Sequence, residues 1–435
     1  MDDKPPQGKP SINIEGDVKD SNIVVGDGNI ITVIRNYLFR DTRQLVIFIS
    51  IFLLVSGGIA GGYWYSKQPS KMTGNFNVAV AQFGEIQENG SIKSSLHAEK
   101  ISSTLFGFLD SEYQASGLGL DVQISHKNMP LIQEDAQAKE LAKKVNADIV
   151  IYGNVFVQGN SAEFSPRFYV AERPDTKELT GQEELANPIA FNLSQLGTQD
   201  QVNAEIRART AILLNFTKSL IYVSKKDSDS ALRAVQTAIT TAEKLPRPFA
   251  GQEVLYLLAA KILTGQNETD KANEMLDQSL ILNPNYARAY LARGNIYYIQ
   301  ANNSNFDSQL LEKAKAQYEL AYQATDQPES AYIPIKAHAA LGNIFVVLAQ
   351  KDNDQNLFSE AIKNYKYVVD EYQRTQDPYL KSYASIAYFG LGAAYERQGK
   401  VQDAVDSYKK ASELTEDMEF KDRIEKQIEA VQAKP

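Results

Sequence analysis

The C-terminal half of the chain repeats a pattern of small and aromatic residues with a period of about 34 residues. The last copy begins at Ser385 and has its marker residues at positions 4, 7, 8, 11, 20, 24 and 27: Tyr388, Leu391, Gly392, Tyr395, Ala404, Tyr408 and Ala411. Small residues let paired helices approach closely, and aromatic residues fill the space between neighbouring pairs. One such unit cannot bury its apolar face alone, so the copies must stack. The pattern therefore predicts a helical solenoid.

The frame resembles the tetratricopeptide repeat. Between residues 204 and 418 it predicts five copies, at about 212–245, 253–286, 287–328, 335–376 and 385–418, with a polar capping helix over 419–435. The third and fourth copies depart from the family pattern, because insertions near residues 302–308 and 351–356 lengthen the turn between their two helices. The resemblance implies an all-α solenoid that binds a protein or peptide partner.

In this family the first helix of each repeat lines a concave groove through positions 2, 5, 9 and 12. The third and fourth copies have a basic residue at position 2 and asparagine at position 9, and the third has tyrosine at position 12. These peptide-binding candidates are Arg288, Asn295, Tyr298, Lys336 and Asn343. The resemblance implies that the asparagines hold a peptide backbone and the basic residues a carboxylate. Position 5 is Leu291 and Ala339, so the full clamp is missing, and ordinary solvated helix surface remains the alternative.

Residues 45–65, LVIFISIFLLVSGGIAGGYWY, form an apolar run without a charge. As a helix the run is about 31 Å long, which matches the hydrocarbon core of a bilayer. Arg40 and Arg43 precede it, Lys67 and Lys71 follow it, and its end is aromatic. A signal peptide is the weaker alternative, because the run begins far from the N-terminus and is too long. The sequence predicts one transmembrane helix.

Four glycines in this run, Gly57, Gly58, Gly61 and Gly62, form two overlapping G-x-x-x-G spacings. Glycines one turn apart flatten a helix face so that a second helix can approach, which predicts a homo-oligomer contact in the membrane. Glycine is also common in single membrane helices, so this alternative stays open.

Flanking charge predicts the orientation. Arg35, Arg40 and Arg43 lie before the apolar run, against Lys67 and Lys71 after it. This bias predicts a cytoplasmic N-terminus and an extracytoplasmic C-terminal region. The order of segments resembles one-component bacterial membrane regulators, which implies a bacterial membrane, but their DNA-binding domain is missing here.

The N-terminal tail has two parts. Residues 1–10 are rich in proline and predicted to be disordered, whereas residues 11–36 alternate short β-branched runs with Gly-Asp turns. A β-rich motif this short cannot bury a core alone and would stack on copies of itself. It resembles short motifs at the ends of bacterial signalling and conflict proteins. A signalling or conflict-system adaptor that assembles through this motif is therefore the alternative function, and an unstructured tail is the other interpretation.

Residues 75–172 alternate apolar strands and amphipathic helices, which predicts a small α/β domain. Strands are expected over 77–83, 121–125, 147–153 and 164–170, and helices over 94–110 and 134–146. The runs VAVAQF and AKELAKKVNADIVIYGNV resemble the N-terminal domain of TolB and FlgO-like domains. That resemblance implies an accessory, non-catalytic module. Residues 173–203 are predicted to be a linker, and the α/β domain and the repeats are expected to have separate cores.

Composition argues against an enzyme. The chain has no cysteine and three histidines far apart in sequence, which disfavours thiol chemistry, imidazole catalysis and clustered metal ligands. A net charge of −9 disfavours nucleic-acid binding. No phosphate-binding glycine loop or nucleophile elbow occurs, so no catalytic, cofactor or metal residue is predicted. The sequence predicts a single-pass, membrane-anchored, non-enzymatic scaffold.

Overall fold

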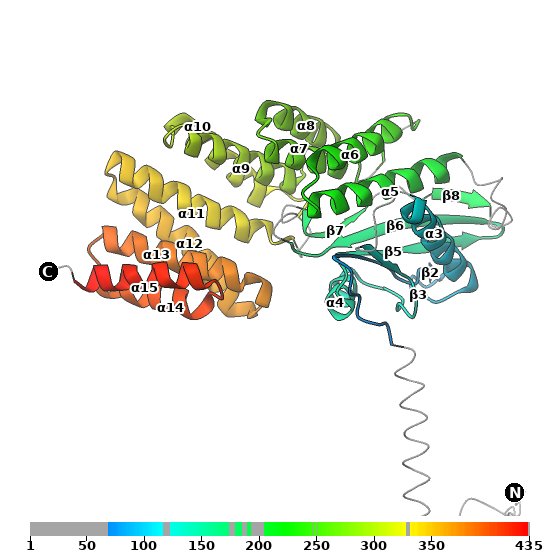
Figure 1. The fold of residues 1–435 in the computed structure, drawn as a ribbon, viewed down its shortest axis with the longest axis horizontal. Helices are drawn as coiled ribbons and strands as arrows, with labels where there is room; N and C mark the ends of the chain where they lie inside the picture. The colour runs from blue at the N-terminus through cyan, green and yellow to red at the C-terminus, as the bar shows by residue number, and fades with distance from the viewer. Residues whose placement is uncertain are drawn as a thin grey trace, which may run out of the picture. The chain divides into compact units, whose positions relative to one another are not determined.

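The computed structural model describes residues 68–115, 122–173, 179–184, 189–192, 204–246, 248–249, 251–327 and 331–433 (Figure 1). The residues from Pro69 onward form one compact unit. The predicted tail over 1–10, the β-motif over 11–36, and the membrane helix over 45–65 with its glycines lie outside the described residues.

The first part of this unit is an eight-stranded mixed sheet. Its strands are β1 (Phe76–Val80), β2 (Gly84–Ile86), β3 (Ile92–Lys93), β4 (Val122–Ser125), β5 (Ile149–Gln158), β6 (Ser161–Val170), β7 (Gly181–Glu184) and β8 (Ile189–Asn192). The order along one path is β3-β2-β5-β1-β4, with β1 parallel to β4 and β5. β6 runs antiparallel to β5 over its whole length and carries β7 and β8 on its other edge. The expected small α/β region is confirmed.

Alternate residues of each strand point to opposite sides of the sheet, and each side has an apolar core. From β1, Val78 and Val80 join a core with α3 (Leu96–Ala115), while Ala79 joins a second core against α4 (Asp135–Val145). The carboxylate of Asp148 fixes the start of this layer by accepting hydrogen bonds from the Asn77 backbone N–H and from the Arg173 side chain.

The remainder is helical and is built from antiparallel pairs. The pairs are α5 (Ala204–Ser224) with α6 (Ser228–Glu243), α7 (Glu253–Gly265) with α8 (Thr269–Leu282), α9 (Ala287–Asn303) with α10 (Ser308–Gln323), α11 (Ile333–Asp352) with α12 (Gln355–Thr375), and α13 (Lys381–Arg397) with α14 (Val401–Leu414). A short 3₁₀ turn, η5 (Pro378–Leu380), precedes α13, and α15 (Met418–Gln432) follows α14. Figure 1 shows the pairs following one another as in a solenoid.

Glycine and tyrosine set the distance between the helices of a pair. A Cβ added at Gly294 would lie 2.6 Å from the Tyr318 ring, and one at Gly342 would lie 2.5 Å from the Tyr365 ring. Tyr365 also lies against Gly390 of the next pair, so one ring packs between two repeats. The insertions predicted in the third and fourth repeats lengthen the first helix of each pair. α9 has 17 residues and α11 has 20, whereas α7 has 13.

Two predictions about domain organisation need correction. Residues 173–203 are no linker, because β7 and β8 lie within this range and pair with β6. Nor do the cores stay separate: sheet residues such as Val155 and Phe168 belong to one apolar cluster with residues of α5 to α9. The Phe168 and Phe216 rings meet with their centroids 4.9 Å apart. The α/β region and the first repeats therefore share one core.

Within the described residues, one helix is long and apolar enough to cross a membrane. It is α11, and 56% of its most apolar stretch is buried inside the repeats. That burial is typical of a core helix of the solenoid. The predicted membrane span, residues 45–65, is a different segment.

Candidate partner-binding cleft

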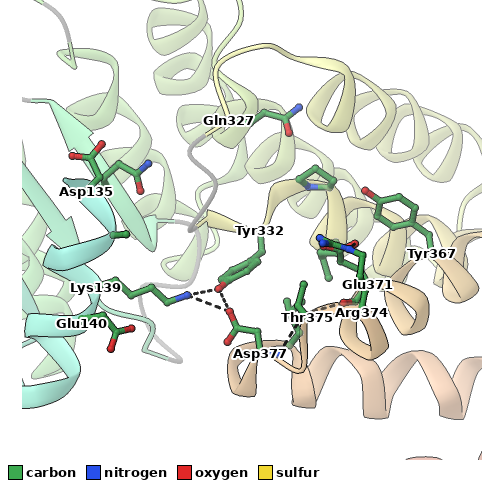
Figure 2. A pocket seen from close by; sticks show the side chains of 15 residues that line it. Asp135, Lys139, Glu140, Gln327, Tyr332, Tyr367, Glu371, Arg374, Thr375 and Asp377 are labelled. Atoms are coloured by element: carbon green, nitrogen blue, oxygen red, sulfur yellow. Dashed lines mark hydrogen bonds and ion pairs between the residues drawn. The ribbon is translucent and has the colours of Figure 1, made fainter.

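A cleft of about 780 Å³ lies between α4 and the fourth helix pair with the η5 turn that follows it (Figure 2). One wall is α4, and the other consists of the start of α11, the end of α12 and the turn that leads into η5. The charged and aromatic residues that line it are Asp135, Lys139, Glu140, Tyr332, Tyr367, Glu371, Arg374 and Asp377. Pro334, Ile335 and Leu380 add apolar surface, so the cleft offers both charge and hydrophobic contact.

Lys139 crosses the cleft from α4 to the repeats. Its ammonium donates to the Tyr332 hydroxyl and lies 3.3 Å from Asp377 Oδ2, and the same hydroxyl donates to that carboxylate. It also lies 4.9 Å from the centre of the Tyr332 ring and 4.6 Å from that of Tyr379. Figure 2 shows this triangle of lysine, tyrosine and aspartate. A carboxylate and two aromatic faces thus bind a cation here.

These groups shift one another's pKa values. Burial alone raises the pKa of Asp377, but hydrogen bonds from the Tyr332 hydroxyl and the Tyr379 N–H, together with the Lys139 ammonium, lower it below its usual range. Burial, followed by the hydrogen bond to Asp377, raises the pKa of Tyr332. Tyr332 also has a φ of 52°, in the left-handed region that a bulky side chain rarely adopts. Strained residues of this kind cluster at ligand clamps and active sites.

The opposite wall carries an aromatic stack. The His338 ring lies between Tyr322 and Tyr367, with centroid distances of 4.7 Å and 4.1 Å, and its Nδ1 is 2.8 Å from Asn364 Oδ1. Burial lowers the pKa of His338, so the ring is neutral near pH 7. Tyr367 ends the stack at the cleft and is 42% exposed.

A smaller cavity of about 310 Å³ adjoins the cleft and shares Asp135, Gln182 and Gln327 with it. Glu183 of β7 lines it, and the Glu183 carboxylate lies 2.7 Å from Arg288 Nη1 and accepts a hydrogen bond from Tyr286. Burial raises the pKa of Glu183 to about 7, although Arg288 and Tyr286 oppose the shift.

Arg288 is not available to a peptide, which corrects the prediction for that residue. Its side chain is 0% exposed. Its guanidinium donates to the backbone carbonyls of Leu179, Thr180 and Gln182, at 3.1, 2.8 and 3.3 Å, beside its ion pair with Glu183. The chain's own strand β7 and the two residues before it therefore take the contacts expected for a partner.

The other predicted groove residues are partly or wholly committed within the repeats. Tyr318 donates to Asn295 Oδ1 at 2.8 Å, and Tyr365 donates to Asn343 Oδ1 at 2.7 Å. Tyr298 is half-buried, and burial raises its pKa. Lys336 is buried. Each asparagine carbonyl thus accepts a hydrogen bond from a tyrosine of its own helix pair. The groove prediction did not include these hydrogen bonds.

Sequence reasoning missed Lys139, Tyr332 and Asp377. Lys139 and Lys143 are four residues apart and share a face of α4, and both ammonium groups lie over the Tyr379 ring, Lys143 at 4.7 Å. The Asp-Pro pair at the start of η5 signals a turn, and Asp377 caps that turn by accepting from the Tyr379 N–H at 2.9 Å. Neither signal indicates that the two segments meet.

Residues 385–417 match the family model described as "Tetratricopeptide repeat". This stretch overlaps the helix pair α13–α14, which is therefore similar to a tetratricopeptide repeat. The match covers the copy in which the spacing of small and aromatic residues is clearest. A comparison with curated proteins gives no match.

Several solved structures are similar to part of the chain. They include BtubC from P. vanneervenii, with 19% identity and a TM-score of 0.38 over 48% of this chain and 82% of that one. PilW, described as a type IV pilus biogenesis factor, has 18% identity and a TM-score of 0.35 over 50% and 80%. A thermophilic TPR protein from Thermus thermophilus has 14% identity and a TM-score of 0.33 over 51% and 98%. Likeness at these TM-scores does not define this fold, and the repeats are assigned from the family match and the helix pairs.

In the part of the chain that the structure describes, no three His, Asp or Glu side chains gather in a way that could hold a metal ion. The charged residues of the cleft are instead arranged as ion pairs and as caps of helices.

Proposed function

We propose that this protein is a membrane-anchored, non-enzymatic scaffold that binds a segment of a partner protein in the cleft between α4, the fourth helix pair and η5. The observation that supports this most directly is the cleft itself, which combines about 780 Å³ of space with charged, aromatic and apolar walls. Pockets of about 300–1,000 Å³ with a few convergent polar groups are typical ligand-binding sites.

The cleft is a better candidate than the groove predicted from the repeat positions. Arg288 is covered by β7, and the Asn295 and Asn343 carbonyls accept hydrogen bonds from their own tyrosines. Tyr367, in contrast, lines the cleft and is 42% exposed.

Site-specific photo-cross-linking in the native cell tests this function. A photoreactive residue replaces Tyr367 in the cleft, and a matched one replaces Met418, which is 76% exposed on α15 and does not line the cleft. We expect a discrete cross-linked product from position 367 and none from position 418. The same products at both positions, or none at 367, would exclude the cleft as the binding site.

Residues 45–65 provide the membrane anchor in this proposal, with the N-terminus in the cytoplasm and the described unit outside. Their glycines would allow two copies to pair in the membrane. Deleting residues 45–65 should release the chain from membranes without detergent. The repeats should melt cooperatively as before, because their core lies entirely after residue 68. Protease added to intact cells should digest the region after residue 71 and spare a tag at residue 1, and the reverse pattern would invert the orientation.

A further inference from the structure

We infer that strand β4 is an edge at which two copies of this chain pair, so that the sheet of one copy continues into the sheet of the other. This inference rests on the membrane anchor of the proposed function and adds the contact that two anchored copies make. Three features of the described residues support it: backbone groups that point outward from β4, the self-complementary pattern of the strand, and the path by which the chain enters the unit.

β4 lies at the end of the path β3-β2-β5-β1-β4, so within the chain only one of its sides is paired. On the far side of β1, the Asn77 carbonyl accepts a hydrogen bond from the Asp148 N–H, just before β5. The next residue, Val78, therefore turns its N–H and C=O toward β4, where Ile124 lies opposite it. In a parallel pair a residue bonds to the two neighbours of the residue opposite it. The N–H and C=O groups of Ile124, and of Val122 two residues earlier, consequently point away from β1.

In the part of the chain that the structure describes, no hydrogen bond engages these outward groups of Val122 and Ile124. Edge strands are usually protected by charged residues, proline or very short length. At the other end of the path β3 has two residues and ends at exposed Lys93, whereas β4 reads Val-Gln-Ile-Ser, without charge or proline. The side chains of Val122 and Ile124 are only partly buried where they pack against the core beside α3. A further strand would therefore satisfy backbone groups and cover apolar side chains at this edge.

A second copy of β4, running antiparallel, fits this edge. With Gln123 opposite Gln123 of the second copy, Val122 of each copy lies opposite Ile124 of the other. Both residues of such a pair have outward N–H and C=O groups and exchange two hydrogen bonds, so the two pairs form four. The Val122 and Ile124 side chains meet on the face that carries the α3 core, as β-branched cross-strand pairs do in stable sheets. β4 is thus complementary to itself, and its lack of charge means that no like charges oppose the contact.

The entry of the chain into the unit places this edge near the anchor. The Thr73 N–H donates to Gln123 Oε1 at 2.9 Å, so the segment that leads in from residue 68 passes beside β4. From residue 65, where the apolar run ends, to Thr73 is eight residues, which span at most about 28 Å. Two copies anchored side by side would therefore hold their β4 strands at an effective concentration on the order of millimolar. A strand of four residues needs such proximity to pair, and an untethered partner strand would not have it.

Disulfide cross-linking of the full-length chain in its native membranes tests this pairing. The chain has no cysteine, so Gln123→Cys introduces a single thiol at the two-fold axis. Opposite residues in a non-hydrogen-bonded antiparallel pair have Cα atoms about 4.5 Å apart, which suits a disulfide. The matched control is Ser125→Cys on the same strand and face, where the two Cα atoms would lie about 14 Å apart. With a mild oxidant, we expect at least about tenfold more disulfide-linked dimer from Gln123→Cys than from Ser125→Cys.

A second variant tests the backbone hydrogen bonds. Proline at position 122 removes an N–H that points away from β1, so the ladder between β1 and β4 is kept while two of the intermolecular hydrogen bonds are lost. Adding Val122→Pro to Gln123→Cys should lower the yield of dimer about fivefold or more. Thermal melts in one detergent should show the same transition with and without the proline, because the fold of each copy does not use this N–H.

Four results would overturn the inference: no dimer from Gln123→Cys, equal yields from Gln123→Cys and Ser125→Cys, an undiminished yield after Val122→Pro, or a cross-linked product of another mass. The last would mean that a different protein occupies the edge. If Gln123→Cys gives no dimer while the chain still needs detergent and position 367 still captures a partner, the scaffold function stands and the pairing at β4 is wrong.

Discussion

Replacing Arg288 by methionine tests how strongly the sheet is fastened to the repeats. Methionine keeps an apolar stem but removes the guanidinium, which lies 2.7 Å from Glu183 Oε1 and donates to the carbonyls of Leu179, Thr180 and Gln182. The variant therefore loses one buried charge pair and three hydrogen bonds in a single step.

The loss of unfolding free energy depends on the groups that remain around Glu183. Glu183 has a side chain only 9% exposed, and Tyr286 stays as its hydrogen-bond donor. Removing one member of a buried ion pair costs about 3–5 kcal/mol, because the other charge is left uncompensated. At a pH well below 7 the carboxyl takes up a proton, and the cost falls toward that of the lost hydrogen bonds, about 1 kcal/mol each.

Urea unfolding of the full-length chain in one detergent, at about pH 8 and about pH 6, measures this difference. The matched control is Arg293→Met on the same helix. Arg293 pairs at 2.6 Å with Asp277, which is 62% exposed, so breaking that pair should cost less than about 1 kcal/mol. The reasoning is refuted if Arg288→Met destabilises the chain no more than Arg293→Met at pH 8, or by the same amount at both pH values.

Three further predictions concern single positions. The pKa of Glu183 is raised from 4.5 to about 7, so between these pH values the folded chain holds a proton that the unfolded chain has released. The free energy of unfolding gained from this proton is lost as the pH rises through about 7. Glu183→Gln should flatten that decline in thermal melts. Asn343→Ala leaves the buried Tyr365 hydroxyl without its acceptor and should cost about 1–3 kcal/mol, and adding Tyr365→Phe should restore most of it in urea titrations; no rescue would contradict the hydrogen-bond account. Gly342→Ala forces a methyl group into the Tyr365 ring and should lower stability by about 1–3 kcal/mol, whereas Gly107→Ala on α3, with no neighbour within 4 Å, should be neutral or stabilising.

The helix pairs could be predicted from sequence because their determinants are local and periodic. A glycine at position 8 and a tyrosine at position 24 contact each other within one repeat, as Gly342 and Tyr365 do. The buried strands of the α/β region could also be predicted from sequence, since β1 and β5 are largely apolar on both faces. Such patterns indicate contacts between buried residues that are close in sequence.

Contacts between distant segments could not be predicted in this way. The strand β7 reads Gly-Gln-Glu-Glu, without the apolar alternation of a strand, and is held by β6 and by Arg288, more than a hundred residues later. The repeat frame placed Arg288 at a groove position but gave no sign that the chain's own strand covers it. Lys139 and Asp377 meet across an even longer separation.

The core that joins the sheet to α5–α9 has a consequence for synthesis. The sheet strands up to β6 leave the ribosome first together with α3, but α3 supplies only part of the core on its face of the sheet, and the rest forms when α5 to α9 have been made. At about 5–20 residues per second, the 133 residues from the end of β6 at Val170 to the end of α9 at Asn303 take on the order of ten seconds to appear. During that interval residues such as Phe168, whose partner Phe216 lies on α5, remain open to the cell. A nascent chain that stalls there would present an apolar surface on which chaperones act.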